Sequence, residues 1–278
     1  IDAVMLIHPW DFWNNDGTPK AWTPEVVAFC EEVLKGNPKH PAALHYYIHI
    51  TEASRHPEVA LPAADILKDL LPGIAHMVHM ASHEYERNGL YAKGVVVNDK
   101  ADEDLNLYKS LAPGIDLHNR VSHYYAVQAY CAMSGGMYKQ GLHDAIRCRE
   151  SVSPTYEKTY LQYLYMMPEM TQVRLGKWEE IIKDQNEPDA HWNYASVLKD
   201  FAKGMAFAYT DHLDSAKVRL QMLQEKSKDS ILLVADTLTN APAPGAQVAG
   251  QILSASISFA EKKYHDAIAH IQQAIETE

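Results

Sequence analysis

The chain has 278 residues, of which 47% are hydrophobic and 22% are charged, as in ordinary globular proteins. Its formal net charge is −11 at pH 7 and it carries no basic stripe, which argues against a nucleic-acid backbone as its partner. No run of residues approaches the roughly 20 apolar positions of a membrane-spanning helix, so no membrane span is predicted.

The three cysteines, Cys30, Cys131 and Cys148, show no CxxC spacing, and their odd number predicts buried, reduced thiols rather than a disulfide framework. The chain begins at Ile1 rather than at a methionine, so a removed signal peptide and an upstream segment both stay open. The sequence is therefore compatible with either a cytoplasmic or a periplasmic location.

Helix-start and helix-stop residues predict a succession of short helices. Thr23-Pro24-Glu25 combines a capping hydroxyl, a proline where no amide proton is needed and an acid near the positive helix end. Gly36, followed by Asn37-Pro38, ends that helix. The same signals predict further helices over residues 41–54, from 57 to just before 72, over 75–87 and over 89–99.

A turn made of a glycine, any residue, an aromatic residue and, further on, a small residue recurs between paired helices. It reads Gly89-Leu90-Tyr91 with Gly94, and Gly136-Met137-Tyr138 with Gly141. Shorter or degenerate copies are Gly176-Lys177-Trp178, Asp211-His212-Leu213 with Ala216, and Lys262-Lys263-Tyr264 with Ala267. This pattern resembles that of the tetratricopeptide-repeat family, whose units are helix–turn–helix pairs.

The resemblance covers most of the chain and implies an all-α fold, a right-handed α-solenoid of about seven helix pairs. We therefore expect one superhelical domain over residues 1–278, with histidine-rich repeats over 1–130 and more degenerate repeats over 131–278. Long intervals between turns predict irregular inserts at 102–117 and 228–247, and the stretch 240–245, with its two prolines and a glycine, cannot be helical throughout. Uncapped solenoid ends leave open an oligomer formed through them.

Two histidine pairs lie one repeat apart along the chain. His45 and His49 are followed by His79 and His83, with an offset of 34 residues in both cases (79 − 45 and 83 − 49). Thirty-four residues is the tetratricopeptide period, so these side chains are expected on neighbouring helices and pointing the same way.

Counted back from the turn residue of each repeat, positions 6, 10 and 13 form one helical stripe. In tetratricopeptide repeats this stripe lines the concave groove where ligands bind. The stripe contains His8, Asp11, His45, His49, His76, His79, His83 and His123, and Glu52 and Glu86 extend it.

A groove lined by imidazoles predicts a transition-metal site. Neutral imidazole binds Zn, Cu and Fe, and two histidines four residues apart place two nitrogens on one helix face. The predicted metal ligands are His45, His49, His79 and His83 at the centre, with His76, His8 and His123 as an outer ring. Glu52 is the candidate carboxylate ligand or catalytic general base. The expected cofactor is thus a Zn, Cu or Fe ion, and the residues leave room for two ions.

Two other interpretations stay open. One is a non-catalytic scaffold whose groove binds a peptide, a protein or a small molecule; the other is repeat duplication without any ligand. Tetratricopeptide families that clamp peptide carboxylates carry Lys, Arg and Asn at these groove positions, whereas this chain carries histidines and acids, which favours a metal. The sequence does not decide whether the site is catalytic.

The histidines also belong to longer strings of residues. His8-Pro9-Trp10-Asp11, His45-Tyr46-Tyr47-Ile48-His49 and His79-Met80-Ala81-Ser82-His83 are similar to strings in a group of bacterial tetratricopeptide-repeat proteins without an established activity. That group carries a further His-Asn motif in the following helix, which matches His118-Asn119 here. The resemblance implies that the histidine strings are a trait of the group.

Overall fold

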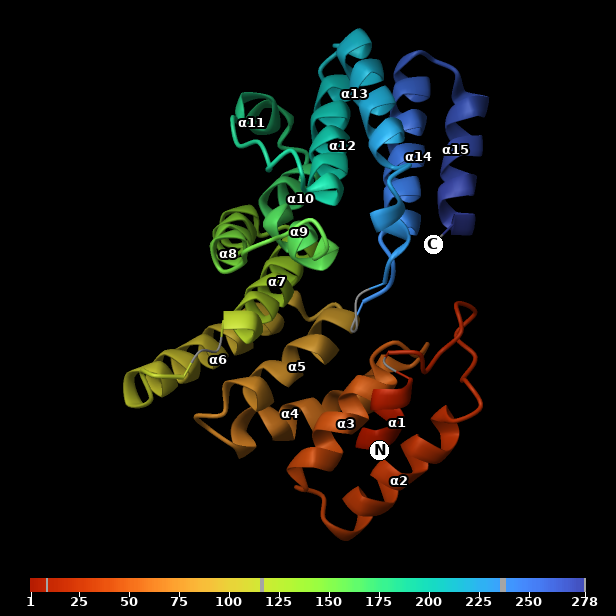
Figure 1. The fold of residues 1–278 in the computed structure, drawn as a ribbon. Helices are drawn as coiled ribbons and strands as arrows, with labels where there is room; N and C mark the ends of the chain where they lie inside the picture. The colour runs from red at the N-terminus through yellow and green to blue at the C-terminus, as the bar shows by residue number, and fades with distance from the viewer. Residues whose placement is uncertain (9, 116–117, 236–238, 278) are drawn as a thin grey trace. The chain divides into compact units, whose positions relative to one another are not determined.

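Helices account for most of the chain (Figure 1). The computed structural model describes residues 1–8, 10–115, 118–235 and 239–277, with the backbone alone for 118–120. These ranges contain fifteen α-helices and two short 3-10 helices but no β-strand, and one isolated bridge joins Trp13 to Pro19. The predicted all-α class is therefore confirmed, whereas the right-handed solenoid of about seven pairs stays a prediction. None of the described helices combines the length and the hydropathy needed to cross a bilayer.

The chain divides into two compact units, Ile1–Gly141 and Leu142–Glu278, and the expectation of one continuous domain stays a prediction. The first unit contains α1 (Asp2–Ile7), α2 (Thr23–Gly36), α3 (Pro41–Thr51), η1 (Pro57–Ala60), α4 (Leu61–Leu70), α5 (Ala75–Arg87), α6 (Tyr91–Leu111) and α7 (His118–Ser134). The following helices are α8 (Tyr138–Glu150), α9 (Thr159–Tyr165), α10 (Met167–Arg174), α11 (Trp178–Lys183), α12 (Asn193–Tyr209), α13 (Leu213–Lys226), η2 (Ser230–Leu233), α14 (Ala243–Ala260) and α15 (Tyr264–Thr277).

The recurring turn has the same backbone geometry at all five predicted positions. The residue at its first position has a positive φ, between 61° and 72°, in every copy: Gly89, Gly136, Gly176, Asp211 and Lys262. The next residue returns a hydrogen bond to a carbonyl five residues earlier, as from Leu90 N to Tyr85 O (2.7 Å) and from Lys263 N to Ser258 O (2.8 Å). This hydrogen-bond pattern is the Schellman motif, a helix ending in which glycine is favoured at the positive-φ position. The two copies without glycine, at Asp211 and Lys262, adopt the same backbone conformation.

The helix boundaries match the predictions for α2 and α5, but α6 is longer than expected. The segment 102–117 was predicted to be an irregular insert, and this is wrong for its first part, because α6 continues to Leu111. The reason is a buried stripe that keeps its helical spacing, from Gly94 through Asn98 and Ala101 to Leu105. In the later insert, α14 begins only at Ala243, so residues 240–245 are not helical throughout, as predicted.

The first unit places α5 in contact with both α3 and α7. Consecutive helices also pack in order, α3 against α4, α4 against α5, α5 against α6 and α6 against α7. Leu44 and Ile48 of α3, Val78 of α5 and Ala129 of α7 are among the buried apolar residues. The first helices of successive pairs are therefore neighbours, as the histidine register requires.

The three cysteines are buried thiols, as predicted. Burial raises the pKa of the Cys131 and Cys148 thiols to about 12, so both are unreactive as nucleophiles at neutral pH.

Replacing Gly94 by alanine should destabilise the first unit, because an added Cβ would lie 2.6 Å from the Sγ of buried Cys131. Overpacking of this kind costs about 1–3 kcal/mol, against a gain in helix propensity of up to about 1 kcal/mol. We expect a net loss of about 1 kcal/mol in the free energy of unfolding, measured by urea denaturation. Gly36→Ala is the control, since nothing lies within 4 Å of its Cβ position. Equal stabilities of the two variants would contradict the tight α6–α7 contact.

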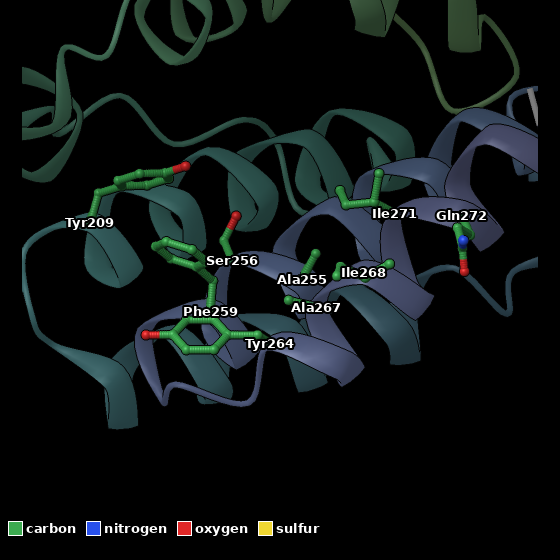
Figure 2. Close-up of a pocket in the computed structure, with 9 residues that line it drawn as sticks. All are labelled: Tyr209, Ala255, Ser256, Phe259, Tyr264, Ala267, Ile268, Ile271 and Gln272. Carbon is green, nitrogen blue, oxygen red and sulfur yellow. The ribbon is translucent and has the colours of Figure 1, made fainter.

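The second unit exposes apolar side chains along its last two helices. Figure 2 shows Tyr209, Phe259, Tyr264 and Ile268 around a pocket of about 420 Å³ beside α14 and α15. Phe259, Tyr264, Ile268 and Ile271 are all exposed. The predicted oligomer through a solenoid end stays a prediction.

Candidate metal centre

Six histidines of the first unit form two triads, and each triad could hold one metal ion. Triad A consists of His45 and His49 from α3 and His76 from α5; triad B consists of His79 and His83 from α5 and His123 from α7. Within each triad, one nitrogen of every ring lies within 4.8 Å of the others. The two triads are adjacent, because the rings of His49 and His83 are 5.4 Å apart.

Helix α5 supplies ligands to both triads. His76, His79 and His83 follow one another at intervals of three and four residues, which places them on one face of that helix. This face lies between α3 and α7, so His76 faces the histidines of α3 while His79 and His83 meet His123 of α7. His79 is fully buried, and the others are buried or half-buried.

In each triad two ring nitrogens have the separation of neighbouring metal ligands. The Nε2 atoms of His45 and His76 are 3.0 Å apart, and those of His79 and His83 are 3.1 Å apart. At ordinary zinc–nitrogen distances, two imidazoles on one ion have their nitrogens about 2.9–3.4 Å apart. Two of the three side chains in each triad are therefore spaced as ligands of one ion would be.

The carboxylate of Glu52 joins the two triads. Its Oε1 lies 3.0 Å from Nδ1 of His49 in triad A, and its Oε2 lies 3.0 Å from Nδ1 of His83 in triad B. Glu52 is the residue directly after α3, and it is buried together with His49, whereas His83 is half-buried. Because a carboxylate only accepts hydrogen bonds, both Nδ1 atoms carry the proton.

Asn98 orients His79 in the same way. The amide nitrogen of Asn98 donates to the carbonyl of Gly94 (2.9 Å), which leaves its Oδ1 facing Nδ1 of His79 at 2.6 Å. Nδ1 of His79 is therefore the protonated nitrogen, and its Nε2 carries the lone pair. Metal-binding histidines are commonly held by an acceptor at the other ring nitrogen, as both Glu52 and Asn98 do here.

These hydrogen bonds turn two lone pairs toward one another in triad B. With Nδ1 protonated in both rings, the neutral forms of His79 and His83 present bare Nε2 atoms 3.1 Å apart. Two acceptors at that distance repel unless a cation lies between them. Either a proton on His83 or a metal ion supplies that positive charge.

The charge states agree with this arrangement. Burial lowers the pKa of His45 and of His123 to about 3, and it also lowers the pKa of His49 and of His79, so these four imidazoles are neutral at pH 7. Burial also disfavours the charged form of His83, but the charge and hydrogen bond of Glu52 outweigh it and raise the pKa of His83.

Glu52 is ionised in the same arrangement. Burial alone would raise the pKa of Glu52, yet the charge of His83 and the hydrogen bonds from both rings lower it below its usual range. The buried carboxylate is thus the counter-charge of the centre. In the structure both oxygens of Glu52 contact imidazole nitrogens. The role of Glu52 as a metal ligand or general base stays a prediction.

His8 lies outside both triads, unlike the other six predicted metal ligands. The prediction that His8 and Asp11 continue a helical stripe is wrong, because α1 ends at Ile7. The next residue, His8, precedes Pro9 in the sequence, and a residue before proline disfavours the helical conformation. The ring of His8 stacks on Trp22 with a centroid distance of 3.7 Å, and Asp11 pairs with Lys20 at 3.1 Å. The side chains of His118 and Asn119, which matched the His-Asn motif, lie outside the described residues.

Asn98 was not predicted as part of the centre, and two aromatic residues also lie beside it. Asn98 holds His79, Tyr124 lies 4.5 Å from the ring of His79, and Trp10 meets the ring of His49 edge-on at 4.9 Å. The sequence does contain a signal for Asn98, since it is a polar residue on the otherwise small and apolar buried stripe of α6.

Comparison with known proteins adds no family: no protein-family profile matches the chain, and no curated protein matches it.

Proposed function

We propose that this chain is a metal-binding protein that holds two transition-metal ions side by side, one on triad A and one on triad B. The observation that carries the proposal is the pair of Nε2 atoms in triad B, which lie 3.1 Å apart and need a positive charge between them because Glu52 and Asn98 occupy the opposite nitrogens. Because His76 and His79 share one face of α5, the two ions would lie roughly one helical turn, ~5 Å, apart.

The donor atoms favour zinc or copper. Among the described side chains, both triads consist of imidazoles alone, and the nearby Glu52 already contacts two Nδ1 atoms. Magnesium and calcium prefer oxygen ligands, and non-haem iron(II) commonly uses two histidines with a carboxylate. Three histidines per ion also leave a coordination position for water or another molecule, as in catalytic zinc sites.

We also propose that the helix pairs form a tetratricopeptide-like array. The support is the shared turn geometry at five positions and the contacts of α5 with α3 and α7. In such an array the first helices of successive pairs line one surface, and the six histidines belong to three such helices.

Elemental analysis of the purified protein tests the function. After removal of adventitious metal and reconstitution with Zn²⁺ or Cu²⁺ in separate samples, we expect two tightly held ions per chain. A chain that retains no stoichiometric ion of either metal, or of iron, would overturn the proposal. A tight peptide complex that is insensitive to chelators would favour the scaffold interpretation instead.

The two sites should respond differently to pH. His83 is protonated below its raised pKa, and a proton on its Nε2 competes with the ion, so the affinity of triad B should fall up to about tenfold per pH unit below that pKa. Two of the three ligands of triad A, His45 and His49, have lowered pKa values, so triad A should lose less affinity than triad B over that range. Isothermal titration calorimetry between about pH 8 and pH 5 measures both. Parallel weakening of the two sites would contradict this assignment.

A further inference from the structure

A small pocket opens beside the histidine triads in the first unit. It has a volume of about 180 Å³ and is lined by Gly73, Ile74, Ala75, His76, Leu105, Tyr108 and Tyr124. The lining comes from the α4–α5 turn, the start of α5, the second half of α6, and α7. Leu105 and Tyr124 are buried, whereas Ile74 is about half exposed at 49% and marks the side that solvent reaches.

The pocket adjoins both triads. His76 is a member of triad A and lines the pocket itself. The ring of Tyr124, another lining residue, is 6.3 Å from the ring of His76 and 4.5 Å from that of His79 in triad B. A molecule in the pocket would therefore lie next to the ligands of the proposed ions.

Size and polarity restrict what the pocket can hold. Cavities of about 150 Å³ accept benzene in other proteins, so this volume suits one aromatic ring and not two. None of the lining residues is Asp, Glu, Lys or Arg, so a charged group would lose its hydration there without a counter-charge. Tyr108, Tyr124 and His76 provide aromatic surfaces for a ring to pack against.

We propose that this pocket binds an uncharged single-ring aromatic molecule with one hydroxyl group, a phenol, whose oxygen approaches the ion on triad A. The inference rests on the proposed function, because the open coordination position of that ion is what the hydroxyl would reach. The ion on triad A would be the polar partner of the hydroxyl group. The volume and the apolar lining of the pocket would admit a single aromatic ring.

Optical titration of the Cu²⁺-loaded protein with phenol tests the proposal. We expect a saturable change in the copper absorption bands with a dissociation constant near ~1 mM, the affinity of a ligand of this size. A two-ring phenol, 1-naphthol, should cause no such change. Ligand-observed NMR with the Zn²⁺-loaded protein should show binding of phenol without relying on copper bands.

Two variants locate the bound phenol. Ile74→Trp fills the exposed side of the pocket and Leu105→Trp fills its buried side, and each should weaken phenol binding at least about tenfold while two ions per chain remain. Leu107→Trp is the matched control for Leu105→Trp, since Leu107 is an exposed residue of the same helix, α6, and does not line the pocket. Ile74→Trp is the safer variant for folding, because its side chain is half exposed.

The outcomes separate this proposal from the proposed function. If no ion binds, both fall together. If two ions bind but phenol changes neither the spectrum nor the NMR signals, the metal sites stand and the pocket proposal is overturned. If phenol binds equally well to wild type, Ile74→Trp and Leu105→Trp, its place in this pocket is overturned.

Discussion

His79→Ala should reduce the metal content from two ions to one. His79 is fully buried, its Nε2 faces that of His83, and no other imidazole of triad B can occupy its position. Structural zinc sites with four protein ligands bind with about 10–16 kcal/mol, or roughly 3 kcal/mol per ligand, so losing one weakens triad B on the order of 100-fold. Triad A shares no ligand with triad B and should keep its ion. Elemental analysis after dialysis against a weak chelator measures this difference.

Two further variants make the result interpretable. His123→Ala removes a less buried member of triad B and should give the same loss of one ion, even if the cavity at position 79 disturbs folding. His56→Ala removes an exposed histidine of the same unit, with 78% of its side chain accessible, and should leave both ions bound. Retention of both ions in His79→Ala and His123→Ala would show that triad B is not a metal site.

Glu52→Gln should weaken both sites at once, unlike any single histidine substitution. The carboxylate accepts one hydrogen bond from each triad, and an amide can accept only one of them while its NH₂ group faces the other Nδ1–H. Loss of such an orienting partner typically costs 10–100-fold in metal affinity, and we expect about that loss at each site. Competition with a chromophoric chelator gives the two dissociation constants.

Glu58→Gln is the matched control for Glu52→Gln. Glu58 pairs with His56 at 3.1 Å, a similar carboxylate–imidazole contact, but both side chains are exposed and belong to neither triad. It should change neither dissociation constant. If Glu52→Gln weakened only one site, the carboxylate would not be the shared support of the centre, and if it abolished both, Glu52 would be a ligand after all.

The sequence predicted the set of histidines that come together, but it did not predict how they divide into triads A and B. The 34-residue offset and the helical stripe identified six side chains that the structure gathers, because a repeated helix pair carries its side chains to equivalent positions. It did not predict that His45 meets His76, 31 residues away, rather than its repeat partner His79. That pairing depends on how far α5 is displaced along its axis relative to α3, and the repeat length alone does not determine this displacement.

Other parts of the site depended on side-chain conformation or on local breaks in the pattern. The spacing placed Glu52 on the histidine stripe, but only the rotamers decide that its oxygens reach two Nδ1 atoms. The placement of His8 on the helical stripe was wrong because the register was counted through a segment that is not a continuous helix. For the fold, the turns were predictable because five of them share one hydrogen-bond pattern, whereas the end of α6 was set by a buried stripe extending beyond its predicted end.

Because α5 contributes to both triads, each proposed ion belongs to the junction of two helix pairs and not to a single pair. Duplicating the α5–α6 pair within the chain would insert one more junction of the same kind, and with it a third set of imidazoles. The number of ions would then grow with the number of junctions, in a row along neighbouring helices. An engineered chain of this type would hold metal ions at regular intervals set by the distance between neighbouring helix pairs.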